Sequence, residues 1–257
     1  MSIRPDAPAI LSDGQEVKVH GSEEFPFAVY RGIMPTFIPA YPLHYHEEME
    51  LICCEAGCGS ITIDRKTVPL QPGEVAVILP GQIHAIAAEE NGTFSYYNIL
   101  FRFSLLELPD SETYRRFLAP LADGSMEVPA RIQKYSPHGR ELSENVWMLI
   151  EKRKENTALR IKACLYGVMD TLCKAATPAR HPTGCEHRDT RLLRQTVQYV
   201  DRHYPEKITV AAISAECGYS SSHFMKRFHD LTGTSFAQYL IHFRLEKAAV
   251  LLRGSRY

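Results

Sequence analysis

The sequence predicts an α+β protein of more than one domain, with a β-rich N-terminal part, a pair of helices and an all-α C-terminal part. The chain has 257 residues, and a length of this order favours two domains over one. From about residue 25 to 103, short apolar runs are broken by Gly and Pro, as is typical of an antiparallel sandwich or barrel. After Pro109 the apolar residues recur with the period of helices.

Five segments of the N-terminal part have the composition of short strands. They are residues 50–55, 60–63, 67–70, 74–79 and 93–103. Turn-forming residues separate several of them, at Asp64-Arg65-Lys66, Gln71-Pro72-Gly73 and Pro80-Gly81. Several short strands at this spacing predict a sheet that is sandwiched or closed into a barrel.

Two helices are expected next, over residues 141–155 and 159–176. In the second helix the apolar residues follow the i, i+4, i+7 rule, and they are Ile161, Leu165, Val168, Met169, Leu172 and Ala176. We expect the two helices to pack antiparallel. Their apolar stripe either covers one end of the barrel or forms a dimer seam, and periodicity does not distinguish these partners.

Composition limits the class of protein. Hydrophobic residues make up 45% and charged residues 23%, which is normal for a globular chain and excludes disordered or collagenous proteins. No run approaches about 18 consecutive apolar residues, and the first six residues lack the apolar core of a signal peptide. We therefore expect a cytoplasmic protein with no membrane partner.

The seven cysteines are an odd number spread along the chain, so free thiols are expected. Cys53, Cys54 and Cys58 lack the spacing of a zinc knuckle. We interpret them as small buried strand residues, with a metal or redox role as the less favoured alternative.

The charge is divided unevenly along the chain. Residues 186–257 carry 11 Lys+Arg against 7 Asp+Glu, whereas residues 1–185 carry 18 against 23. A basic C-terminal third indicates that this end meets a polyanion such as DNA, although the charge division alone is weak evidence.

A helix-turn-helix pattern lies in this basic part. Thr209 is a good N-cap for a short helix, Gly218 supplies the left-handed residue that ends it, and Ser220 begins a second helix. In helix-turn-helix proteins the second helix enters the major groove. The alternative is an ordinary helical hairpin.

The second helix has two distinct faces. Phe224, Phe228 and Leu231 lie four and three residues apart and should face the core. The residues expected to meet DNA are Ser221, Ser222, Met225, Lys226, Arg227 and His229. Ser and Lys donate to base edges, whereas Arg227, nearer the DNA backbone, should contribute salt-dependent affinity. A solvated helix face is the alternative.

The run Cys217-Gly218-Tyr219-Ser220-x3-Phe224-x3-Phe228 is followed by Thr232-Gly233-x-Ser235-Phe236-x2-Tyr239-Leu240 and Arg244-Leu245-x2-Ala248. It resembles the AraC/XylS family of bacterial transcription regulators, from Leu193 to the end of the sequence. The resemblance implies a recognition helix over 221–228 that reads bases through Ser222, Met225 and Lys226. The family's domain has two helix-turn-helix units, and the sequence stops where the second should begin, so only the first unit is expected.

A candidate metal site precedes the first predicted strand. His44-x-His46-x3-Glu50 have the same parity, so one continuous strand would place them on one face, and His84 follows a later turn. Imidazoles and a carboxylate inside a barrel can bind Zn, Ni, Fe or Mn ions. They can equally be hydrogen-bonded groups of a pocket for an organic ligand.

The same residues, with Gly57 and Gly73, resemble the two metal motifs of the cupin superfamily, whose β-barrel is the sensor of many AraC-type regulators. The second motif departs from the family pattern, because Leu79 stands where proline is expected and Ala87 where asparagine is usual. The resemblance implies a small-molecule effector, such as a sugar or another small metabolite. Its contacts could include Tyr45, Tyr97, Asn98 or Arg102.

These observations predict a dimeric, ligand-responsive transcription regulator rather than an enzyme. The expected domains are a cupin-like sensor over 1–138, a helical pair over 139–177, a linker over 178–188 and a DNA-binding domain over 189–257. The alternative function is a metal-dependent cupin enzyme, an oxygenase or an isomerase. It would leave the helix-turn-helix without a role.

Overall fold

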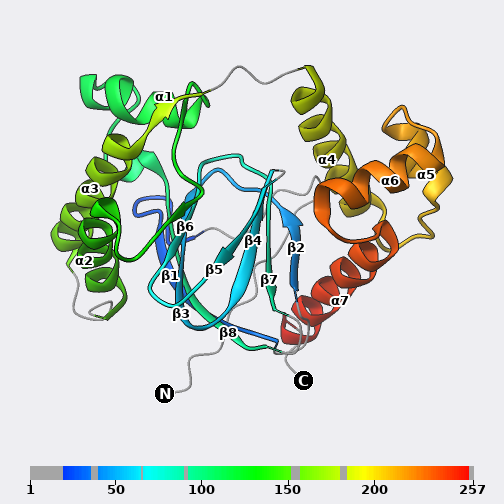
Figure 1. Cartoon of the computed structure of the whole chain (residues 1–257), viewed down its shortest axis with the longest axis horizontal. Coiled ribbons are helices and arrows are strands. Elements are labelled where there is room, and N and C mark those ends of the chain that lie inside the picture. Colours follow the sequence, from blue (N-terminus) through cyan, green and yellow to red (C-terminus); the bar gives the residue numbers. More distant parts are fainter. Residues whose placement is uncertain are drawn as a thin grey trace.

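The computed structural model describes residues 20–35, 40–64, 66–89, 92–151, 157–179 and 184–254 (Figure 1). Two β-sheets lie in the middle of the molecule, with one group of helices on each side. The expected α+β class is confirmed. Among the described helices, none has the length and apolar character needed to cross a bilayer.

The first sheet has five antiparallel strands in the order β1-β8-β3-β6-β10. They are β1 (Phe27–Met34), β8 (Phe94–Phe101), β3 (Met49–Gly57), β6 (Val75–Ile78) and β10 (Arg131–Ile132). The second sheet has the order β2-β7-β4-β5, with β2 (Ala40–His44), β7 (His84–Ala88), β4 (Gly59–Ile63) and β5 (Lys66–Leu70). Strands β9 (Met126–Glu127) and β11 (Thr177–Pro178) form a small separate pair.

The two sheets pack against each other through an apolar interior. This interior includes Ile52 and Ile78 of the first sheet with Ile61 and Ile86 of the second, all of them buried. Gly59 lies against the ring of Phe94, where a Cβ would come within 2.4 Å of the ring. The close approach explains a glycine inside a strand.

Sequence patterns missed β1, β2 and β7. Pro42 interrupts β2, and proline argues against a strand because it cannot donate to the ladder. Strand β7 is rich in alanine, which has low strand propensity. Pairing with neighbours distant in sequence, rather than local propensity, forms these strands.

The helical pair is α2 (Pro137–Glu151) and α3 (Ala158–Ala175). It covers the outer face of the first sheet, where Leu142, Val146, Leu165 and Val168 pack in one cluster with strand residues such as Ile99. The apolar stripe therefore packs on the outer face of the first sheet, rather than at one end of the barrel as expected. Connecting segments that were not predicted are η1 (Phe103–Leu105), η2 (Tyr114–Leu118) and α1 (Ala119–Ala122).

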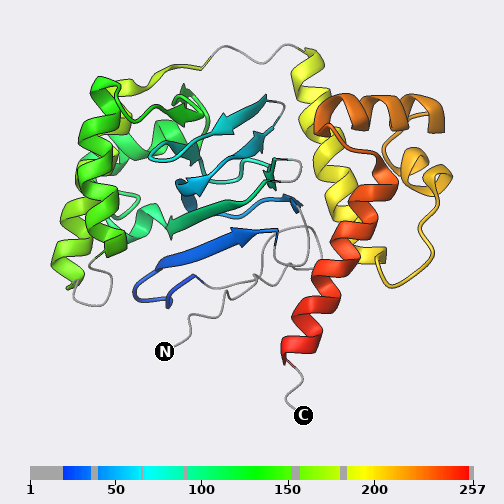
Figure 2. The ribbon, with the colours of Figure 1, turned by 60° about the horizontal axis from the view of Figure 1, so that its bottom comes forward.

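The C-terminal helices are α4 (Gly184–His203), α5 (Val210–Glu216), α6 (Ser221–Thr232) and α7 (Phe236–Gly254). The expected linker over 178–188 is too long, because Pro178 belongs to β11 and α4 already begins at Gly184. The backbone amide of Ala179 also donates to the carbonyl of Ser125, which extends the pairing with the sensor side. Figure 2 shows α7 running beside the sheets, and the core of these helices joins the apolar interior of the barrel.

Candidate functional site

Four side chains meet inside the barrel. Their potential ligand atoms, from His44, His46, Glu50 and His84, all lie within 4.8 Å of one another. None of the four residues is more than 3% exposed. The structure therefore brings together the complete set of predicted metal ligands.

The two sheets supply these residues from different directions. His44 ends β2 and lies directly opposite His84 of β7, with 4.1 Å between the ring centroids. His46 follows β2, and Glu50 is in β3 of the other sheet. The single continuous strand assumed from the sequence is wrong, because the chain changes sheets between residues 44 and 49.

Backbone carbonyls set the tautomer of each histidine. The Nδ1 atoms of His44 and His84 donate to the carbonyls of Pro42 and Gln82, each at 2.9 Å, and Nδ1 of His46 donates to that of Glu48 at 3.0 Å. A carbonyl can only accept, so the proton of each neutral ring resides on Nδ1. The Nε2 lone pairs are then available to a cation, as in metal-ligating histidines.

The carboxylate of Glu50 lies at the centre of this arrangement. Its Oε2 atom is 3.0 Å from Nε2 of His46 and 2.9 Å from Nε2 of His84. Two lone pairs facing an anionic oxygen repel it unless a proton or a metal ion lies between them. The donor set thus has the chemistry of a divalent-metal site with nitrogen and oxygen ligands.

Burial and the neighbouring charges shift the pKa values of His44 and Glu50. Burial lowers the pKa of His44 well below its ordinary value, and the neighbouring rings of His84 and His46 lower it further. Burial alone would raise the pKa of Glu50. With a proton, rather than a metal ion, between Oε2 and the Nε2 atoms, hydrogen bonds and charge attraction from His46 and His84 outweigh burial and leave the pKa of Glu50 well below its ordinary value. A neutral His44 and an anionic Glu50 are the forms that bind metal.

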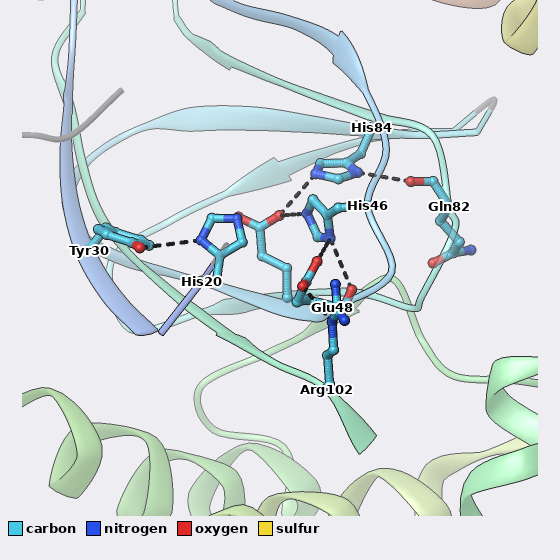
Figure 3. A network of polar contacts seen from close by, with 8 residues as sticks. His20, Tyr30, His46, Glu48, Gln82, His84 and Arg102 are labelled. Carbon is cyan, nitrogen blue, oxygen red and sulfur yellow. Dashed lines mark hydrogen bonds and ion pairs between the residues drawn. The ribbon is translucent and has the colours of Figure 1, made fainter. Parts of the chain in front are cut away.

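A second layer of polar groups surrounds the cluster (Figure 3). Nε of Arg102 donates to Glu48 at 2.8 Å, and the other carboxylate oxygen of Glu48 is 3.7 Å from Nδ1 of His46. On the opposite side, the buried His20 contacts Tyr30, with 3.3 Å between Nδ1 and the hydroxyl. Sequence reasoning missed His20 and Glu48. Glu48 was detectable as the residue two beyond His46, whereas His20 carried no local signal.

The other side chains considered as effector contacts are scattered. The ring of Tyr97 packs against Trp147 under the helical pair, with 6.2 Å between centroids, so it faces away from the cluster. The guanidinium of Arg194 lies over Tyr45, 5.7 Å from the ring centroid. Asn98 lies directly opposite Tyr30, the partner of His20, and its Oδ1 atom is buried without a hydrogen-bond partner in the described part of the chain.

The cysteines do not join the site. Cys54, which shares the parity of Glu50, donates its thiol to the carbonyl of Gly57. Burial raises the pKa of the Cys54 thiol to about 12 and raises that of Cys53 further. Protonated thiols are poor ligands, so the interpretation as buried strand residues fits Cys53 and Cys54. It is wrong for Cys58, which is half-buried and lies between β3 and β4.

The helix-turn-helix has the predicted caps. The side chain of Thr209 accepts from the amide of Ala212, that of Ser220 accepts from the amide of His223, and Gly218 has φ of 74°. Phe224, Phe228 and Leu231 are buried, as their spacing predicted. Helices α5 and α6 therefore have the geometry of a helix-turn-helix.

The six residues expected at DNA divide into two groups. Ser222, Met225, Lys226 and His229 are exposed on α6. Ser221 is half-buried, and its hydroxyl is 3.1 Å from that of Ser214 in α5. Arg227 forms a two-pronged ion pair with the buried carboxylate of Asp189 in α4. Ser221 and Arg227 thus hold α6 in place within the domain.

Comparison with protein families gives two matches. Residues 38–167 match the AraC-like ligand binding domain, and residues 200–240 match the bacterial regulatory helix-turn-helix proteins of the AraC family. One relative is the uncharacterized HTH-type transcriptional regulator YdeC of Bacillus subtilis (strain 168). It is 22% identical over 246 residues, which cover 93% of this chain and 82% of YdeC.

The solved structures that match this chain include two regulators. The AraC-like transcriptional activator CuxR is 12% identical, with a TM-score of 0.40, and the match covers 88% of this chain and 78% of CuxR. ToxT from Vibrio cholerae is 11% identical, with a TM-score of 0.43, and the match covers 84% of this chain and 98% of ToxT.

Proposed function

This chain belongs to the AraC family of bacterial transcription regulators, with a ligand-binding domain and a helix-turn-helix DNA-binding domain, and we propose that its sensor works through a bound divalent metal ion. The ion would be held by His44, His46, Glu50 and His84. When bound, it would supply a positive charge that balances Glu50 and a centre to which an oxygen-bearing effector can attach. Zn, Ni, Fe and Mn all suit such ligands.

One observation carries this proposal. Three buried histidines each donate Nδ1 to a backbone carbonyl, and Nε2 of His46 and of His84 lies within 3.0 Å of the same carboxylate oxygen of Glu50. A pocket that only makes hydrogen bonds does not require three histidine rings whose Nε2 lone pairs are fixed by hydrogen bonds at Nδ1. Burial of all four donors also favours an ion held for sensing over one that turns over a substrate from solution. We therefore propose a regulator without enzymatic activity.

The effector and the DNA contacts are part of the same proposal. A small oxygen-rich molecule, such as a sugar or another small metabolite, would reach the ion beside Asn98, whose buried oxygen needs a hydrogen-bond donor. Ser222, Met225 and Lys226 would read bases from α6, with His229 at the edge of the contact. Such a protein would act in the cytoplasm, and pairing of two chains would supply a second reader.

Elemental mass spectrometry on untagged protein tests the metal proposal. We expect about one divalent ion per chain in the wild type and none in a His44→Ala, His46→Ala double variant. The matched control is His203→Ala, which removes a histidine of α4 whose side chain is 39% exposed, and this variant should keep the ion. A metal-free wild type that nevertheless binds a small organic molecule would contradict the metal proposal and leave a polar effector pocket.

A further inference from the structure

The DNA-binding helices touch the barrel at the metal-ligand segment. The hydroxyl of Tyr239 in α7 donates a long hydrogen bond of 3.5 Å to the backbone carbonyl of Leu43, the residue directly before His44. Tyr239 is only 2% exposed, so this contact is enclosed. A tyrosine of the DNA-binding domain thus lies one residue from a candidate ligand.

Arg194 of α4 makes a second contact with the same region. Its Nη2 atom donates to the carbonyl of Gly81 at 3.1 Å, and its guanidinium lies over the ring of Tyr45. Gly81 in turn donates its backbone amide to the carbonyl of His46 at 2.8 Å. Arg194 therefore contacts two neighbours of His46: Tyr45, which precedes it in the chain, and Gly81, which is hydrogen-bonded to its carbonyl.

These contacts alternate with the ligands along a very short segment. Leu43 and Tyr45 contact the DNA-binding helices, whereas His44 and His46 direct their rings at Glu50 and its neighbours. The backbone cannot shift at one set without moving the other. We propose that residues 43–46 couple the two domains, so that ion binding and docking of Arg194 and Tyr239 stabilise each other. This inference rests on the proposed metal site.

Docking of α4 and α7 on the barrel fixes the position of the recognition helix α6, but it does not block DNA from reaching that helix. Ser222, Met225 and Lys226 remain exposed while α4 and α7 are docked. The apolar core of the DNA-binding helices is also continuous with the barrel interior, so the two parts move as one body while they are docked. Loss of the ion would loosen segment 43–46 and release α6 from its fixed direction.

Thermodynamic reciprocity makes the coupling measurable without a known operator. If ion binding favours docking, then docking favours ion binding by the same factor. We would titrate the metal-free full chain with zinc, using competition with a chromophoric chelator. An Arg194→Ala, Tyr239→Phe double variant should bind zinc about fivefold or more weakly, although neither residue is a ligand. Arg191→Ala removes an exposed arginine of the same helix and should bind zinc as the wild type does.

Hydrogen exchange provides a readout of docking. In the wild type, zinc should slow amide exchange in peptides covering residues 43–46 and 236–243. In the double variant, zinc should leave exchange over 236–243 unchanged. Arg194→Lys keeps the charge but loses the forked donor, so it should have an intermediate zinc affinity even if the double variant is too unstable to measure.

The outcomes separate the inference from the function on which it rests. Equal zinc affinity in the wild type, the double variant and Arg194→Lys would overturn the coupling and leave the metal site intact. A wild type that binds no zinc, nickel, iron or manganese would overturn both. Weaker zinc binding in Arg191→Ala as well would also overturn the coupling, because it would show a general effect of lost charge.

Discussion

Arg227 and Asp189 join the recognition helix to α4. Nε and Nη2 of Arg227 donate to the two carboxylate oxygens of Asp189 at 2.7 and 2.6 Å. The side chain of Asp189 is 2% exposed and that of Arg227 is 26% exposed. Helical spacing assigned Arg227 to the DNA backbone, but the ion pair indicates that it positions α6.

Arg227→Ala should therefore act first on stability. Removing the cation leaves a buried carboxylate without this partner, and we expect the free energy of unfolding to fall by about 2–4 kcal/mol. Affinity for DNA should fall without a change in its dependence on salt concentration. Urea denaturation and binding at several salt concentrations would check this. If the variant instead kept its stability, and its DNA affinity depended on salt concentration by about one ion less, then Arg227 would contact the phosphate backbone.

Lys226→Ala and Ser222→Ala should have the opposite pattern. Both side chains are exposed on α6, so stability should change little, whereas discrimination between bases should decrease by about 1–3 kcal/mol. The measurement is competition between DNA variants from the region upstream of the gene, by fluorescence anisotropy. Lys207→Ala removes an exposed positive charge before α5 and should weaken binding to all sequences equally, if it has any effect. If both α6 variants discriminated between bases as well as the wild type does, the recognition face would be assigned wrongly.

The C-terminal helices were predictable because their signals are local. Thr209, Ser220 and Gly218 act within three or four residues of their own positions, so caps and turns are visible in sequence. The partner of Arg227 lies 38 residues away, and helix periodicity carries no information about it. Periodicity identifies the exposed face of a helix but not its long-range ion pairs.

The meeting of His44, His46, Glu50 and His84 was predicted from an incorrect premise. The motif placed His44, His46 and Glu50 together on one strand, but the chain crosses between sheets, and the contact of the two sheets brings them together. Cys54 is on the same strand as Glu50 and shares its parity, but it lies four residues further along β3, where its thiol donates to the carbonyl of Gly57. His20 could not be predicted, because tertiary packing alone brings it next to His46.

Acid should destabilise the metal-free protein through the cluster. The pKa of His44 is lowered on folding, so below pH of about 6.5 the unfolded chain binds a proton that the native state does not. The pKa of Glu50 is also lowered, so its stabilising contribution is present above its ordinary pKa and is lost as the pH falls further. Each group contributes a slope of up to about 1.4 kcal/mol per pH unit.

His44→Gln should flatten the upper part of this dependence. Chemical denaturation in the presence of a chelator, at pH values from 7 to 5, would measure it. His203→Gln, at a half-buried histidine outside the cluster, should retain the wild-type slope. An unchanged slope in His44→Gln would mean that His44 takes up a proton in the folded protein as readily as in the unfolded chain.

A buried ion pair should dominate the stability of the DNA-binding domain. Nζ of Lys247 in α7 is 2.7 Å from Oδ1 of Asp201 in α4, and the side chain of Asp201 is fully buried. Lys247→Met should lower the free energy of unfolding by about 3–5 kcal/mol, because the carboxylate loses this cation. Lys174→Met breaks two ion pairs of well exposed partners, with Asp170 in α3 and Glu141 in α2, and should change stability little.

The double variant Asp201→Asn, Lys247→Met separates charge from packing. If the loss in Lys247→Met comes from an uncompensated carboxylate, removing that charge should restore most of the stability. If it comes from packing of the lysine stem against Tyr204 and Phe243, whose ring centroids lie 5.2 and 5.1 Å from Nζ, the double variant should remain as unstable as Lys247→Met. We expect restoration, since methionine retains the length of the apolar stem while the isolated buried charge is gone.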